Sequence, residues 1–155
     1  MMFMTARVDL KKILVLLGIV AGLIAASLWL LGGADEVPTA APSAGTNEGR
    51  TEFLKGFGWE VAPSPVESSQ VKIPKSNTEV FERYNQLQKS QGYDLGQFAG
   101  KHVMRFVYKI NNYPGSSDPV YATLLVYKNQ VIGGDITNTA PNGKIHGFEM
   151  PAGAE

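Results

Sequence analysis

The sequence predicts an α+β fold: an N-terminal transmembrane helix, a flexible linker, and an antiparallel β-meander of about four strands covered on one face by one or two helices. Three observations lead to this prediction. Residues 13–31 carry no charge. Residues 76–92 space their apolar side chains with a helical period, and residues 102–148 alternate apolar and polar side chains as strands do.

The uncharged run 13–31 is long enough to span a membrane. A helix that rises about 1.5 Å per residue covers roughly 30 Å over this run, the thickness of a bilayer's hydrocarbon core. Lys11 and Lys12 precede it, whereas Asp35 and Glu36 follow it. Because positive flanks stay in the cytoplasm, we expect a single-pass plasma-membrane protein with a cytoplasmic N-terminus and an extracytoplasmic C-terminal domain.

A cleaved signal peptide is the alternative, since a basic flank, an apolar run and small residues also occur there in that order. The run exceeds the about 7 to 15 apolar residues of a signal peptide, which favours a retained anchor. After it, residues 32–47 are rich in Gly, Ala, Pro, Thr and Ser, and this composition predicts a flexible linker. The predicted division is 1–12 (cytoplasmic tail), 13–31 (anchor), 32–47 (linker) and 48–155 (extracytoplasmic domain).

Charge and cysteine content exclude several function classes. The chain has 14 Lys and Arg against 14 Asp and Glu, and residues 48–155 are balanced as well. A neutral domain without a basic patch is not expected to bind nucleic acid. The chain has no cysteine, which rules out disulfides, cysteine-ligated zinc and a cysteine nucleophile. No P-loop, dinucleotide or zinc-protease motif occurs, so we expect no cofactor and no metal site.

The first part of the domain predicts one short helix and two short strands. Residues 48–57 place Phe53 and Leu54 on one side of a helix that a glycine ends. Residues 59–61 and 70–73 alternate like short strands, and prolines follow both.

A second helix is expected from a capping box. Ser76 can accept a hydrogen bond from the backbone of Glu79, whose side chain reaches back, and Gly92 is suited to the left-handed position after the last turn. The helix would cover the sheet with an apolar stripe. The stripe comprises Val80, Phe81, Tyr84 and Leu87.

The remaining residues predict an antiparallel meander. The expected strands are 102–110, 120–127, 131–137 and 145–148, with a tight turn at 128–130. One face of the second and third of these strands is apolar. It is formed by Val120, Ala122, Leu124, Val126, Ile132 and Ile136.

A series of short motifs carries a family resemblance. The motifs are Phe53-Leu54, Gly58-Trp59-Glu60-Val61, Ile73-Pro74, Tyr84-Asn85, Gln91-Gly92-Tyr93-Asp94-Leu95, Asn112-Tyr113-Pro114 and Val131-Ile132-Gly133-Gly134-Asp135-Ile136. In this order, over residues 53–148, the chain resembles the family called domain of unknown function 4830. The resemblance implies a short, N-terminally anchored exported protein of Gram-positive bacteria. It implies no reaction, ligand or catalytic residue.

A possible ligand face lies opposite the apolar face of the sheet. Tyr121 and Tyr127 alternate away from that face, and Gly133 and Asp135 do the same on the next strand. Aromatic rings beside a glycine gap and one carboxylate suit an envelope peptide or glycan. The alternative is architectural, because glycines inside a strand also let a helix side chain approach the backbone closely.

These patterns favour a non-enzymatic binding or interaction module at the cell envelope, with a peptide, glycan or protein partner. No catalytic constellation is evident in the sequence. An accessory envelope enzyme that uses His146 and Asp135 is the first alternative, and it requires the two side chains to converge. An accessory subunit of a membrane complex is the second, and it requires a contiguous exposed apolar surface.

Overall fold

The computed structural model describes residues 43–152 of the chain. The expected cytoplasmic tail, the anchor 13–31 and most of the linker lie outside these residues. Within residues 43–152, no helix is both long and apolar enough to cross a membrane. The linker was expected to reach residue 47, but the folded domain already includes Ala44, which is buried and donates its N–H to the Asn129 carbonyl at 2.9 Å.

The α+β class is confirmed, and residues 43–152 contain five strands in one antiparallel sheet of order β1-β2-β3-β4-β5. The helices are α2 (Asn47–Gly56), α3 (Glu79–Ser90) and the 3₁₀ helix η1 (Leu95–Phe98). The strands are β1 (Glu67–Lys72), β2 (His102–Ile110), β3 (Val120–Tyr127), β4 (Gln130–Asn138) and β5 (Ile145–His146).

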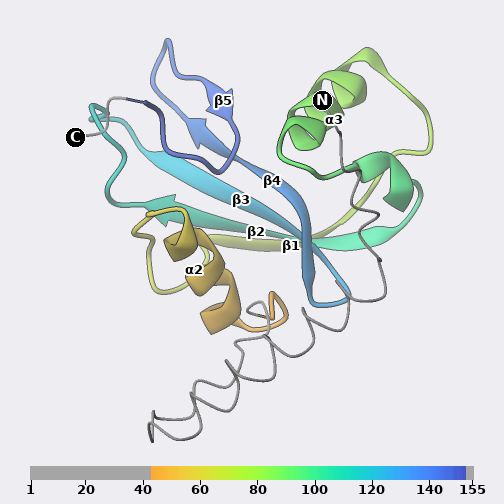
Figure 1. Ribbon diagram of the computed structural model, residues 1–155, viewed down its shortest axis with the longest axis horizontal. Helices are drawn as coiled ribbons and strands as arrows, with labels where there is room; N and C mark the ends of the chain where they lie inside the picture. Colours follow the sequence, from red (N-terminus) through yellow and green to blue (C-terminus); the bar gives the residue numbers. More distant parts are fainter. Residues whose placement is uncertain (1–42, 153–155) are drawn as a thin grey trace, which may run out of the picture. The chain divides into compact units, whose positions relative to one another are not determined.

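Helices cover both faces of the sheet, so the expectation of one covered face is wrong. Figure 1 shows α2 and α3 on opposite sides of the strands. Leu54 of α2 belongs to one buried cluster with Leu124, whereas Phe81 of α3 belongs to a second cluster with Leu125. Consecutive residues of β3 are therefore buried on opposite faces. This explains why the strand is apolar along its length and does not alternate with polar residues. We call these the α2 face and the α3 face.

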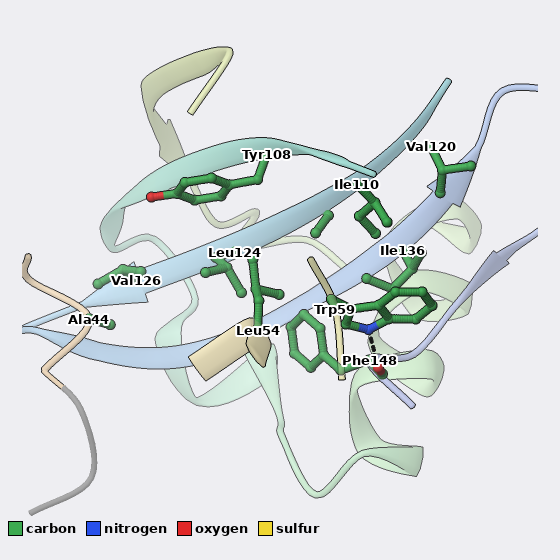
Figure 2. Close-up of a cluster of buried hydrophobic side chains, with 11 residues drawn as sticks. Ala44, Leu54, Trp59, Tyr108, Ile110, Val120, Leu124, Val126, Ile136 and Phe148 are labelled. Carbon is green, nitrogen blue, oxygen red and sulfur yellow. Dashed lines mark hydrogen bonds between the residues drawn. The ribbon is translucent and has the colours of Figure 1, made fainter. Parts of the chain in front are cut away.

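The α2 face is the more aromatic of the two. Trp59 and Phe148 are each 1% exposed, and the Trp59 Nε1–H donates to the Phe148 carbonyl at 2.6 Å (Figure 2). The strand expected at residues 59–61 is reduced to an isolated bridge between Val61 and Ile110. The Trp59 indole is buried in the core, and its hydrogen bond joins the chain after β5 to this cluster.

Helix α3 begins two residues later than the capping box predicts. Thr78 is the N-cap, and its hydroxyl accepts from the Phe81 N–H at 3.2 Å. The expected stop is confirmed, since Gly92 has φ +87° directly after the C-cap. The buried positions are Phe81, Asn85 and Gln88, whereas Val80 is 79% exposed and thus does not belong to the core stripe.

The β3–β4 hairpin has a two-residue turn and a bulge. Lys128 and Asn129 both have positive φ, 47° and 64°, as a type I′ turn requires. A register shift at Leu125 and Val126 inserts an extra residue into β4. Ile132 consequently packs in the α3-face cluster and not on the expected apolar face.

Candidate functional site

A groove of about 660 Å³ runs beside β5, the last strand of the sheet. Its lining comes from the ends of both helices, the β2–β3 loop and the chain around β5. These residues are Phe57, Ser90, Gln91, Tyr93, Tyr113, Asn138, Asn142, Gly143, Lys144, Ile145, His146, Gly147, Phe148, Glu149 and Pro151. The groove therefore combines segments that are far apart in sequence.

A stack of rings forms the wall on the α2 face. The Tyr113 ring lies parallel to buried Trp59, with centroids 5.7 Å apart and an interplanar angle of 3°. The Tyr113 hydroxyl lies 3.1 Å from His146 Nε2, and His146 Nδ1 lies 2.7 Å from the Gly147 carbonyl oxygen. Because a carbonyl only accepts, Nδ1 donates to the Gly147 carbonyl, and the Tyr113 hydroxyl is the partner of Nε2. Both nitrogens are thus engaged in holding the wall.

Gln91 also lines the groove and joins α3 to the sheet edge. Its Nε2 donates to the Gly134 carbonyl at 3.1 Å, and its Oε1 accepts from the Phe148 N–H at 2.8 Å. One side chain therefore holds β4 and the segment after β5 together. The Tyr93 ring packs against the Phe148 ring, and burial raises the pKa of the Tyr93 hydroxyl.

The chemistry of the groove is aromatic and uncharged overall. Lys144 and Glu149 are its formal charges and cancel, while Gln91, Asn138 and Asn142 supply amides. Within residues 43–152 no group of three or more His, Asp or Glu residues could hold a metal ion. Such a lining can contact apolar groups and exchange hydrogen bonds with a neutral polar ligand.

A second hollow of about 370 Å³ lies on the α3 face and contains Asp135. Asp135 is 6% exposed and accepts hydrogen bonds from the Tyr84 hydroxyl and the Thr137 hydroxyl, both at 2.7 Å. Burial, and next the Asp135 carboxylate, raise the pKa of Tyr84 above its ordinary value. The phenol therefore remains a donor, and the pair ties α3 to β4.

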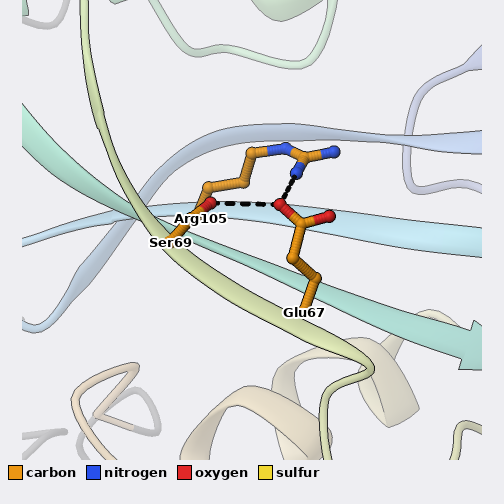
Figure 3. Close-up of polar contacts among 3 residues, drawn as sticks. All are labelled: Glu67, Ser69 and Arg105. Carbon is orange, nitrogen blue, oxygen red and sulfur yellow. Dashed lines mark hydrogen bonds and ion pairs between the residues drawn. The ribbon is translucent and has the colours of Figure 1, made fainter.

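At the rim of this hollow, Arg105 of β2 pairs with Glu67 of β1. The Arg105 guanidinium lies 2.5 Å from the Glu67 carboxylate, which also accepts from the Ser69 hydroxyl at 3.1 Å (Figure 3). The hydrogen bond from Arg105, and then the one from Ser69, hold the pKa of Glu67 below its ordinary value. Both groups of the ion pair are part-exposed, so the pair contributes little to stability.

The sequence-predicted ligand face does not form one open surface. Tyr127 packs edge-on against Phe98 with ring centroids 5.5 Å apart, and Asp135 is buried. Gly133 lies under α3, where an added Cβ would stand 2.8 Å from the Gln88 Oε1. Tyr121 is half-buried and pairs with Thr137 across the β3–β4 ladder. The architectural explanation therefore accounts for the two glycines of β4.

His146 and Asp135 do not converge. His146 pairs with Ile136, which is buried in the α2-face cluster, and paired residues in an antiparallel ladder project to the same face. Asp135 projects to the α3 face, where it meets Tyr84. The pair that the enzymatic alternative requires is thus divided between two faces.

The groove beside β5 was missed at the sequence level. Gln91, Tyr93 and Tyr113 all lie in motifs of the family resemblance, but nothing in their spacing indicates that they meet. They come together through the tertiary packing of α3 and the β2–β3 loop around β5.

Fold and site define an α+β domain with one antiparallel sheet, helices on both faces and an aromatic groove at one sheet edge. The family described as Domain of unknown function (DUF4830) matches residues 53–136, and the chain belongs to this family. No curated protein and no solved structure matches the chain. The matched range contains Gln91, Tyr93 and Tyr113 and stops before β5.

Proposed function

We propose that the chain is a non-enzymatic binding module of the cell envelope, tethered to the plasma membrane by residues 13–31, with its folded domain outside the cytoplasm. The groove beside β5 is its ligand site. The observation that carries this proposal is the lining: rings and amides around about 660 Å³, with no net formal charge. Concave sites with an apolar lining and a few placed polar groups are typical of ligand binding.

The hydrogen bonds of the groove favour binding over catalysis. The hydrogen bonds of His146 within residues 43–152 go to the Tyr113 hydroxyl and the Gly147 carbonyl, so the imidazole is held by residues of the wall and not oriented by a carboxylate. Asp135 is likewise committed to Tyr84 and Thr137. Because these hydrogen bonds already hold the wall in place, less conformational entropy is lost when a ligand binds.

The proposal is tested by site-specific photo-crosslinking of the full-length chain in its native membrane. A photo-reactive residue replaces Ile145, which lines the groove and is 59% exposed. Val80 on α3 is 79% exposed and lies outside the groove lining, so it serves as the matched control. We expect an adduct of defined mass from position 145 that position 80 does not give. Identical adducts at both positions, or none at position 145, would contradict the proposal.

A further inference from the structure

Resting on the proposed function, we infer that the ligand of the groove is an extended, uncharged peptide segment that pairs with the outer edge of β5 as a sixth strand. The inference starts from the register of the β4–β5 ladder and from the walls on either side of it.

The register determines which backbone groups of β5 point outward. The Asn138 N–H donates to the Lys144 carbonyl at 3.1 Å, so these two residues form a hydrogen-bonded pair. Thr137 and Ile145 are the next pair along the ladder. Hydrogen-bonded and non-hydrogen-bonded pairs alternate in antiparallel ladders, so Ile145 directs both its N–H and its C=O away from β4.

These two groups lack a hydrogen-bond partner within residues 43–152. Ile145 is itself part of the groove lining, and its side chain is 59% exposed. A donor and an acceptor on one edge residue are the groups that an added antiparallel strand uses, and the side chain offers an apolar contact beside them. A glycan has no regular alternation of N–H and C=O to match this edge.

The walls favour a single chain over a second copy of the domain. Gln91 and Tyr93 line the groove from the chain at the end of α3, and Tyr113 and Phe57 line it from the β2–β3 loop and the end of α2. A second copy would bring these same residues beside its own β5. A lone extended segment has no such flanks. Because Lys144 and Glu149 cancel, an uncharged segment matches the lining.

The experiment uses the full-length chain in detergent micelles and a library of N-acetylated, C-amidated hexapeptides of uncharged residues. Chitotetraose, a neutral tetramer of N-acetylglucosamine, is the glycan arm. Retained molecules are identified by mass spectrometry after size exclusion, and the best hexapeptide is resynthesised with one N-methyl group at each backbone amide in turn. We expect peptides to be retained and the N-methyl effect to alternate, because only every second N–H of a strand faces its neighbour.

Two variants of one residue separate backbone pairing from side-chain contact. Ile145→Pro removes the outward N–H and leaves the ladder to β4 intact, since proline is tolerated on edge strands when its nitrogen faces away from the partner. We expect it to weaken the best hexapeptide about tenfold, because the peptide carbonyl that accepts from this N–H is left without its partner. Ile145→Val keeps the backbone groups and should change the affinity less than about threefold.

Several outcomes would overturn the inference. They are retention of chitotetraose without any peptide, retention of neither, an N-methyl effect without alternation, and equal affinity for Ile145→Pro and the unchanged chain. The N-methyl series is read on the unchanged protein and so does not depend on how Ile145→Pro folds. A groove-specific adduct at position 145 combined with no peptide retention would leave the binding module standing and remove only the strand-addition inference.

Discussion

Two consecutive glycines of β4 show which contacts of a single residue can be predicted from the sequence. Gly133 and Gly134 indicate close backbone approach, and the structure confirms it on both faces of the sheet. The neighbours could not be predicted, because Gln88 comes from a helix more than forty residues away and Phe148 from the chain after β5. Gln88 is 0% exposed, and its Oε1 accepts from the Gly134 N–H at 2.8 Å. Fully buried residues are usually apolar, so residue type alone does not predict a buried glutamine at this position.

Gly134→Ala tests this close approach. An added Cβ would stand 2.1 Å from the Thr123 carbonyl oxygen and 2.5 Å from the Phe148 ring, so backbone and core must shift. We expect a loss of about 1–3 kcal/mol or more in the free energy of unfolding, the usual cost of overpacking. Gly56→Ala is the control, since its Cβ meets nothing within 4 Å at the end of a helix. There we expect a gain of up to about 1 kcal/mol.

Urea unfolding of the full-length chain in detergent, followed by circular dichroism, measures both variants. A Gly134→Ala chain as stable as the unchanged protein would mean that β4 and Phe148 tolerate a side chain between them. It would also remove the structural reason for this glycine.

The Glu67 carboxylate predicts a pH dependence at the β1–β2 edge. Its pKa in the folded chain is lowered from 4.5, so the stabilisation by Arg105 is present above about pH 4.5. It is lost as the pH falls through the lower folded value. We expect the NMR titration midpoint of Glu67 to lie below 4.5 and to rise in Arg105→Gln. Arg83→Gln removes an ion pair on α3 instead and should leave that midpoint unchanged.

At the scale of elements, alternation and period predicted most of the fold. Strand β2 has the bounds that its alternation indicates, and the helix stop at Gly92 is where a left-handed glycine places it. Errors arose where two local signals compete. Ser76 and Thr78 both precede a helical pattern, and the hydroxyl that caps α3 is Thr78. The bulge at Leu125 and Val126 places Ile132 on the α3 face, whereas Ile136 lies on the expected face, and no periodicity argument detects this local change.

Neighbouring residues at the start of α3 test which side of this helix packs. Phe81 is 9% exposed in the α3-face cluster, whereas Val80 is 79% exposed. Phe81→Ala should therefore cost about 3–5 kcal/mol of unfolding free energy, and Val80→Ala should change it by less than about 0.5 kcal/mol. Urea titrations of the two variants give the comparison. Equal losses would mean that α3 is rotated on the sheet relative to the arrangement described.

At the scale of the whole molecule, the number of covered faces and the groove both arise from packing between distant segments. Leu124 and Leu125 are consecutive apolar residues of β3, and such a pair indicates a sheet that is buried on both faces. For so short a chain, however, a sheet covered by helices on one face is the simpler prediction. The groove joins four segments between Phe57 and Pro151. Its existence depends on where loops and helix ends meet, which the local sequence does not specify.

The topology of the full chain is a further prediction at this scale. Lys11 and Lys12 before the uncharged run and Asp35 and Glu36 after it predict that residues 43–152 face away from the cytoplasm. Proteinase K added to intact cells stripped of their wall should therefore remove the folded domain and leave a small N-terminal fragment in the membrane. A cytoplasmic protein that stays intact is the control for cell integrity. A domain already released, with no membrane fragment, would identify a cleaved signal peptide. Protection of the entire chain until the cells are permeabilised would show that the orientation is reversed, and the groove beside β5 would then face cytoplasmic ligands.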